Sequence, residues 1–165
     1  MQASYELEPP VDSSAVQVRL KQIKNSIDFI KLKLKSRPND SESVVVFCGD
    51  FNVNGLPQNI SDGKHSVEYM LMMDILSAKT DNSQTDEMCV RNVIFEHFAE
   101  HPVTTNTILN GHNDFDKKCL DYIFEFHREN QGSKVQSVEI ASFPVENKPF
   151  SHLSDHSGVV VVLHI

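Results

Sequence analysis

The run Val44-Val45-Val46-Phe47-Cys48-Gly49-Asp50-Phe51-Asn52 decides the fold of this chain. Its first five residues are β-branched, aromatic or small and apolar, which is typical of a strand buried on both faces. The run ends abruptly at a glycine and an aspartate. A charged side chain at the end of a buried strand must be paired, hydrogen-bonded or metal-bound, so Asp50 and Asn52 become candidate functional residues. An Asx turn that only closes the strand explains them about equally well.

Helices are expected on both sides of this strand. Over residues 12–35, apolar side chains recur at spacings of three and four, which predicts an amphipathic helix packed on a sheet. Helical spacing returns over residues 65–78, and residues 86–101 form either another helix or a covering loop. Further strands are predicted at 119–126, 135–143 and 158–165. Without repeats or a low-complexity linker, this order predicts one layered α/β (α+β) domain over residues 1–165.

Composition restricts the function. The chain has 165 residues, 39% of them hydrophobic and 23% charged, which is typical of one soluble domain. Its net charge of −8 argues against a basic nucleic-acid-binding face. No apolar run approaches the roughly 20 residues of a membrane span, and the N-terminus lacks the pattern of a signal peptide. The three cysteines show no CxxC spacing and are expected to be small buried residues rather than disulfide or metal ligands.

Three polar clusters interrupt the apolar strand patterns. They are Gly49-Asp50-Phe51-Asn52, Leu120-Asp121-Tyr122-Ile123-Phe124 and Ser154-Asp155-His156-Ser157-Gly158. Carboxylates at strand ends are oxygen ligands of the kind that Mg²⁺ prefers, and a nearby histidine can accept or orient a proton. Taken singly, Asp121 is more simply a solvent-facing strand residue, and a loop whose histidine caps a neighbour explains the third cluster about equally well. The joint occurrence of all three clusters favours a catalytic site.

In this order and strand context the three clusters resemble the motifs of the endonuclease/exonuclease/phosphatase superfamily of metal-dependent phosphoesterases. The flanking segments 18–23, 118–119 and 150–153 are similar to the neutral sphingomyelinase branch. The resemblance implies that the chain is the C-terminal part of a four-layer α/β sandwich. In that family a metal-binding Glu and a His precede the segment that Met1-Gln2-Ala3-Ser4 matches, so the resemblance implies an N-terminally truncated domain.

The resemblance also implies a mechanism, in which a metal-activated water hydrolyses sphingomyelin to ceramide and phosphocholine at a membrane surface, with Mg²⁺ as cofactor. Asp50 would orient or deprotonate the water, and Asn52 would hold the water or a phosphoryl oxygen. His156 would act as general base or donor, Asp121 would fix its imidazole, and Asp155 would lie in the metal shell. Relatives are secreted or membrane-associated. Without the family's Glu, weak or absent turnover is expected from these 165 residues alone.

Alternatives remain open at this level. The three motifs are shared with nucleases and inositol-phosphate phosphatases, and a catalytically dead fragment or interaction module would use the surface left uncovered. Several residues near the third motif are interfacial or, more simply, core: Phe143, Pro144, Pro149 and Phe150. The polar segment 104–113 either borders the substrate or is only a loop. The remaining histidines, including His65 and His101, are expected to be surface residues or to have satisfied hydrogen bonds.

Overall fold

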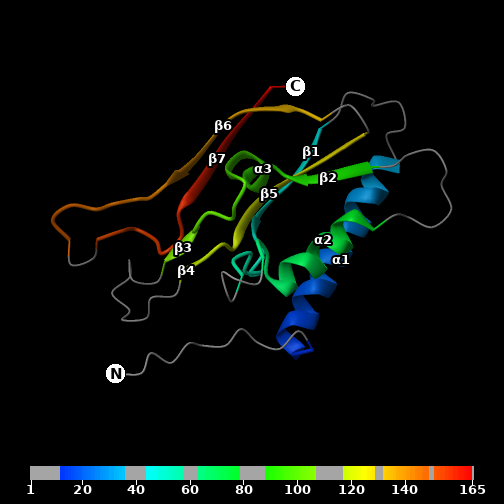
Figure 1. The fold of residues 1–165 in the computed structure, drawn as a ribbon, viewed down its shortest axis with the longest axis horizontal. Coiled ribbons are helices and arrows are strands. Elements are labelled where there is room, and N and C mark those ends of the chain that lie inside the picture. The colour runs from blue at the N-terminus through cyan, green and yellow to red at the C-terminus, as the bar shows by residue number, and fades with distance from the viewer. Residues whose placement is uncertain are drawn as a thin grey trace.

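The computed structural model describes residues 12–35, 44–57, 63–78, 88–106, 117–128, 132–148 and 151–164. Helices combine with antiparallel sheets, which confirms the predicted α+β class (Figure 1). The elements are α1 (Ser14–Lys35), β1 (Val45–Asp50), α2 (Val67–Ser77), β2 (Met88–Asn92), α3 (Val93–Phe98), β3 (Thr105–Asn106), β4 (Lys117–Lys118), β5 (Asp121–Arg128), β6 (Lys134–Ala141) and β7 (Gly158–His164).

A three-stranded antiparallel sheet in the order β1-β5-β2 carries the core. Phe47 on β1 lies opposite Phe124 on β5, and both face α1 and α2. The helices contribute apolar side chains at helical spacing, among them Ile23 and Ile27 of α1 and Met72 of α2, all at most 5% exposed. Burial of such stripes is the main source of helix stability in proteins. The predicted helices at 12–35 and 65–78 are thus confirmed within a residue or two.

The expectation that β1 is buried on both faces is wrong. Its exposure alternates, with Val46 46% exposed and Cys48 exposed as well. β1 is the first strand of the sheet, and the two helices cover only the face that Phe47 shares. The continuous apolar run therefore reflects the β propensity of its residues and does not mean that both faces of the strand are buried. For the same reason Cys48 is not the buried residue expected, whereas Cys119 is buried; all three cysteines are free thiols.

In the described part of segment 86–101, which begins at residue 88, strand β2 is followed by the short helix α3, which corrects the expected single helix or loop. β2 pairs with β5 so that Arg91 lies opposite Glu125. Glu125 is fully buried, and the Arg91 guanidinium Nη2 lies 2.6 Å from its carboxylate. The backbone N–H of Ser133 donates to the same carboxylate at 2.7 Å. A buried charge requires such partners. Ser133 lies eight residues from Glu125 in sequence and Arg91 lies 34 residues away, and strand periodicity indicates neither contact.

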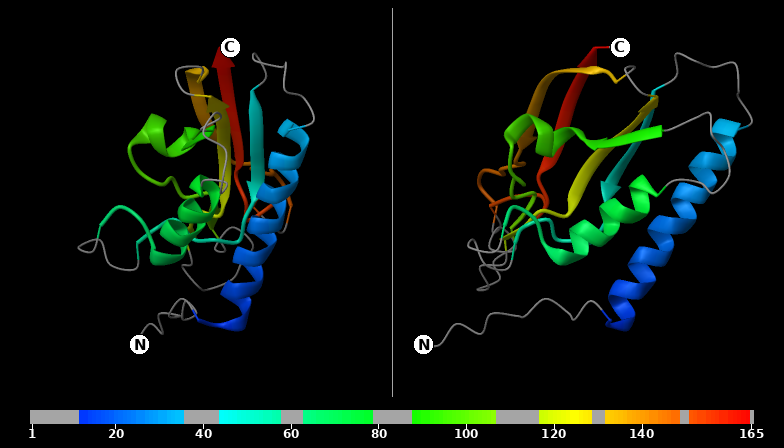
Figure 2. Two further views of the ribbon diagram at one scale, coloured as in Figure 1. Left: turned by 90° about the vertical axis from the view of Figure 1, so that its right-hand side faces the viewer. Right: turned by 45° about the vertical axis from the view of Figure 1, so that its right-hand side comes forward.

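The predicted strands at 135–143 and 158–165 form a separate antiparallel pair, β6-β7, confirmed with ends shifted by one or two residues. Figure 2 shows this pair beside the β1-β5-β2 sheet, with α1 and α2 on the other side of that sheet. Beyond the pair, the connecting segment projects from the body of the molecule. Of the helices in the described ranges, none is both long and apolar enough to cross a membrane.

Candidate active site

Asp50 ends β1 and begins a tight turn. The backbone N–H of Asn52 donates to Asp50 Oδ1 at 2.8 Å, and the Asn52 side-chain amide donates to Oδ2 at 3.3 Å. Asn52 has a φ of 53°, the left-handed conformation that asparagine tolerates better than most residues. The turn considered from sequence is therefore present. It leaves both Asp50 and Asn52 exposed, with carboxylate lone pairs still free for a ligand.

The strand register brings the second motif against the first. Asp50 is the direct cross-strand partner of Asp121, so the two side chains stand on the sheet face that α1 and α2 do not cover. Directly opposed like charges are destabilising, and their Cβ atoms are typically about 5 Å apart. The arrangement is stabilised only if a cation, a proton or a hydrogen-bond donor compensates it. One such donor comes from the third motif.

His156 Nδ1 lies 3.0 Å from Asp121 Oδ2. Because a carboxylate accepts and cannot donate, this contact places a proton on Nδ1 and leaves Nε2 of the neutral ring as an acceptor. Both side chains are partly exposed, 33% for His156 and 19% for Asp121, so the pair is open to solvent. The structure thus joins residues 35 positions apart in the geometry of a base and its orienting carboxylate.

Thr104 fixes the segment that carries His156, a role that sequence did not indicate. The Thr104 hydroxyl accepts from the backbone N–H groups of Leu120 and Asp121, at 3.0 and 3.2 Å. Its carbonyl accepts from the N–H of Ser157 at 2.7 Å. Thr104 is fully buried. This part of the expected loop 104–113 therefore holds His156 and Asp121 together, while residues 107–113 lie outside the described ranges.

Asp155 precedes His156, and its carbonyl accepts from the N–H of Asn106 at 2.8 Å. Its carboxylate is partly exposed. Within the described ranges, His, Cys, Asp and Glu side chains nowhere gather as three or more around a possible metal position. Mg²⁺ needs only one or two protein carboxylates beside waters and substrate phosphate. Asp50 and Asp155 therefore fit Mg²⁺ in chemical kind, and the metal role of Asp155 stays a prediction.

A hollow of about 180 Å³ opens beside Asp50, between α1 and the end of β1. Arg19 and Gln22 line it from the helix, and Cys48 and Gly49 from the strand. The guanidinium of Arg19 lies 2.7 Å from the carboxylate of Glu68 on α2. This ion pair keeps α1 and α2 in place beside the Asp50 turn.

Hydrogen bonds from three side chains, those of Tyr122, Asn54 and Ser66, fix the backbone that follows Asn52. The hydroxyl of Tyr122 lies 2.7 Å from the carbonyl oxygens of both Val53 and Cys119. The Asn54 side-chain oxygen accepts from the N–H of Cys119 at 3.2 Å, and the Ser66 hydroxyl donates to the Asn54 carbonyl. Burial raises the pKa of the Tyr122 phenol well above its usual value, so it remains a donor. The chain that follows the Asp50 turn is therefore hydrogen-bonded to the buried residues Cys119 and Tyr122.

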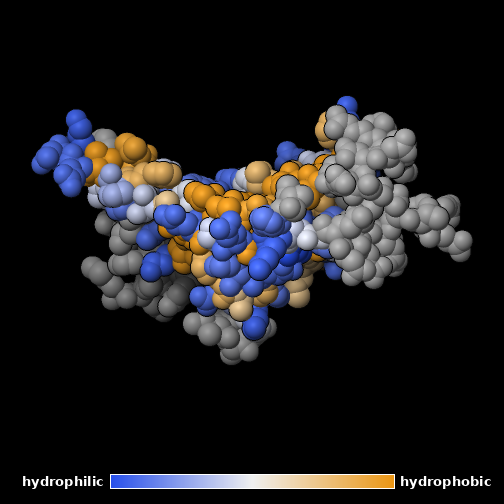
Figure 3. Space-filling view, turned by 90° about the horizontal axis from the view of Figure 1, so that it is seen from above, coloured by the Kyte–Doolittle hydropathy of each residue, from blue (hydrophilic) through white to orange (hydrophobic). Residues whose placement is uncertain are grey.

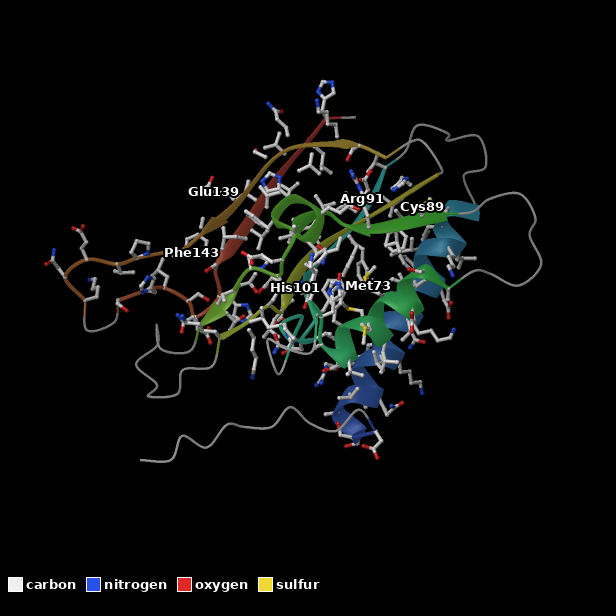
Figure 4. The ribbon with its side chains drawn as sticks, viewed as in Figure 1. Met73, Cys89, Arg91, His101, Glu139 and Phe143 are labelled. Atoms are coloured by element: carbon white, nitrogen blue, oxygen red, sulfur yellow. The ribbon has the colours of Figure 1, made fainter. Side chains whose placement is uncertain are left out.

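His101 is neither a surface histidine nor a satisfied one, which corrects the expectation from sequence. It is 6% exposed and lies near the middle of the molecule (Figure 4). Its Nε2 is 2.8 Å from Nδ1 of His65, whereas its Nδ1 has no hydrogen-bond partner. Burial, and secondarily the nearby His65, lowers the pKa of His101 to about 4. A Cβ on Gly55 would lie 2.8 Å from that Nδ1, so the close approach requires glycine.

Comparison with known proteins finds a relative whose name agrees with the family that the motifs resemble. The chain is 28% identical to a sphingomyelinase of Dictyostelium discoideum, in an alignment of 227 positions that covers all of this chain and 48% of the relative. The chain therefore spans about half the length of this curated relative. No protein-family model matches the sequence.

Proposed function

We propose that this chain carries part of the active site of a metal-dependent phosphodiesterase of the endonuclease/exonuclease/phosphatase superfamily, acting on sphingomyelin. One observation carries the proposal: His156 contacts Asp121 at 3.0 Å, and Asp121 lies directly opposite Asp50. The likeness to a sphingomyelinase supports the same conclusion. Phosphodiester hydrolysis needs a positioned water, a proton carrier and compensation of negative charge.

Each residue has a role that follows from its contacts. Asp121 holds the His156 ring so that Nε2 accepts a proton from the attacking water, or in protonated form donates to a phosphoryl oxygen. Asp50 accepts a hydrogen bond from that water. Asn52, already hydrogen-bonded to Asp50, offers an uncharged amide to a phosphoryl oxygen without repelling it.

Mg²⁺ is the proposed cofactor, with Asp50 and Asp155 as the residues of this chain that would hold it. When bound, the ion would lower the pKa of a water and neutralise phosphoryl charge. Because the described residues supply few ligands, we propose that turnover by these 165 residues alone is slow.

The substrate proposal has its own support beside His156. Leu153 is 71% exposed and Phe143 is 45% exposed, and the N–H of Leu153 donates to the Phe143 carbonyl at 2.9 Å. Phe143 lies on the segment that projects from the molecule beyond β6 (Figure 4), where Figure 3 shows hydrophobic atoms beside hydrophilic ones. Leu153 lies three residues before His156, and its backbone contact brings Phe143 beside it. Exposed apolar side chains at this place suit a substrate held in a lipid bilayer.

The test is phosphocholine release from sphingomyelin vesicles, measured with protein in excess over substrate and with Mg²⁺ present. DNA and inositol phosphates serve as competing substrates. Hydrolysis of sphingomyelin that stops when EDTA removes the metal supports the proposal. Hydrolysis of DNA or inositol phosphates alone would contradict the substrate, and no hydrolysis of any of the three would contradict catalysis by this chain.

A binding module is the second candidate, because the described residues leave apolar strand side chains uncovered. Val160 is 51% exposed and Val162 43%, both on β7, in addition to Val46 on β1. Sheet faces of this kind are typical of surfaces that contact another polypeptide. If the chain is a binding module, it should hydrolyse neither sphingomyelin nor DNA nor inositol phosphates.

A further inference from the structure

Helix α1 carries a second apolar stripe on the side opposite the core. Val18 is 55% exposed, Phe29 59% and Leu32 64%, whereas Val16, Ile23 and Ile27 are buried. With 3.6 residues per turn, positions 18, 29 and 32 fall within one narrow sector, roughly opposite 16, 23 and 27. Figure 2 shows α1 on the outside of the molecule, with the sheet and α2 on its inner side. Single exposed apolar residues are ordinary, but this alignment is not required by the fold.

Basic side chains border this stripe. Lys33 Nζ lies 5.3 Å from the centre of the Phe29 ring. Lys21 projects on the other side of the stripe by helical position. Three other basic residues of α1 have partners away from the stripe: Arg19 pairs with Glu68, Lys24 pairs with Asp28 at 2.9 Å, and Lys31 Nζ donates to the Ala78 carbonyl at 2.7 Å. Lys21 and Lys33 thus flank an apolar stripe on the outer face of α1, in a chain of net charge −8.

We propose that the outer face of α1, made of Val18, Lys21, Phe29, Leu32 and Lys33, binds the surface of a membrane that contains anionic phospholipid. Apolar residues bordered by lysines on a helix are typical of helices that lie in the lipid interface. Each basic residue near an anionic surface adds to the attraction.

A lipid surface matches both features of this face, because the stripe offers apolar side chains to the lipid interface and Lys21 and Lys33 can meet anionic headgroups. A second copy of the chain and a protein partner are the alternatives that the experiment below distinguishes.

The position of α1 connects this face with the candidate active site. Gln22 and Ser26, on one flank of the stripe, line the hollow that also contains Asp50. A membrane bound along α1 would therefore lie close to that hollow. The relevance to catalysis rests on the proposed function, but the binding itself does not.

Co-sedimentation of the 165-residue chain with vesicles tests the inference without any substrate. We expect binding to phosphatidylcholine vesicles that contain phosphatidylserine, and little binding to phosphatidylcholine alone. The F29S/L32S variant and the K21E/K33E variant should each weaken binding by about tenfold. Matched controls are V160S/V162S on β7 and K134E on β6, which should bind like the original chain. Circular dichroism identifies any variant that has lost its helices.

Binding that is independent of phosphatidylserine, or unchanged in both α1 variants, would overturn the inference. Absence of vesicle binding by the original chain would also overturn it and leave the face to a protein partner. Concentration-dependent dimerisation that F29S/L32S abolishes would assign the face to a second copy. Since these vesicles contain no sphingomyelin, failure of the proposed hydrolysis leaves this result unaffected, and the reverse holds as well.

Discussion

At the residue scale, the candidate site depends on a few side chains whose contact partners lie far away in sequence. Asp121 joins Asp50 across the sheet and His156 across a loop. All three were candidates from sequence, Asp50 because it ends an apolar run and Asp121 and His156 because their clusters occur together with it, and their catalytic roles stay predictions. Thr104 and His101 were not, because their importance arises from partners that the fold brings together: the N–H of Asp121 in one case and His65 in the other.

Replacing Thr104 by Val should lower turnover about tenfold and cost about 1–3 kcal/mol of stability, because two partly buried N–H groups lose their acceptor. Thr104→Ser keeps the oxygen and should recover most of both. Urea unfolding and single-turnover hydrolysis provide the measurements. Equal turnover in the Val and Ser variants would mean that Thr104 does not position His156.

His101 should make the stability depend on pH. Its pKa of about 4 in the folded chain lies below the usual 6.5, so the unfolded state binds the proton more readily. Its contribution is complete above about pH 6.5 and is lost as the pH falls toward 4, amounting to about 3 kcal/mol.

The matched variants for this prediction are His101→Phe and His97→Phe. His97 is exposed, so its replacement should leave the pH dependence of unfolding unchanged, whereas His101→Phe should flatten it. Denaturant unfolding between pH 4 and pH 7 gives the comparison. An equally steep loss of stability in the His101→Phe variant would contradict the assignment.

At the element scale, periodicity predicted the helices α1 and α2 and the strands β5, β6 and β7. It failed at β2, where Arg91 interrupts the apolar pattern because its partner is the buried Glu125. It also failed on the burial of β1, because propensity does not say whether a second layer covers the outer face. The register of β1 against β5 could not be predicted from the sequence either, although the direct pairing of Asp50 with Asp121 depends on it.

Glu125 and Arg91 should be strongly coupled. Burial alone would raise the pKa of Glu125, but the Ser133 N–H and the Arg91 guanidinium outweigh it and lower that pKa. Removing the cation by Arg91→Met should therefore cost about 3–5 kcal/mol, since a buried charge loses its partner. Adding Glu125→Gln to that variant should recover part of the loss. Chemical unfolding of the single and double variants would show no such recovery if the pair were not coupled.

At the scale of the whole molecule, one sheet supports both the core and the candidate site. The face toward α1 and α2 holds the aromatic core, and the opposite face presents Asp50 and Asp121. The α+β class was predictable from the order of patterns along the chain. The placement of β6-β7 as a separate pair was not, because β pairing depends on contacts between distant segments.

The most direct test of the central claim is hydrolysis by Asp121→Asn, compared with the original chain under single-turnover conditions with Mg²⁺. Asparagine keeps the size of the side chain but cannot hold His156 as a carboxylate does, so phosphocholine release should fall about 10²-fold or more, while the unfolding curve changes little. Hydrolysis of sphingomyelin at an unchanged rate by this variant would contradict the claim that Asp121 and His156 form the catalytic pair.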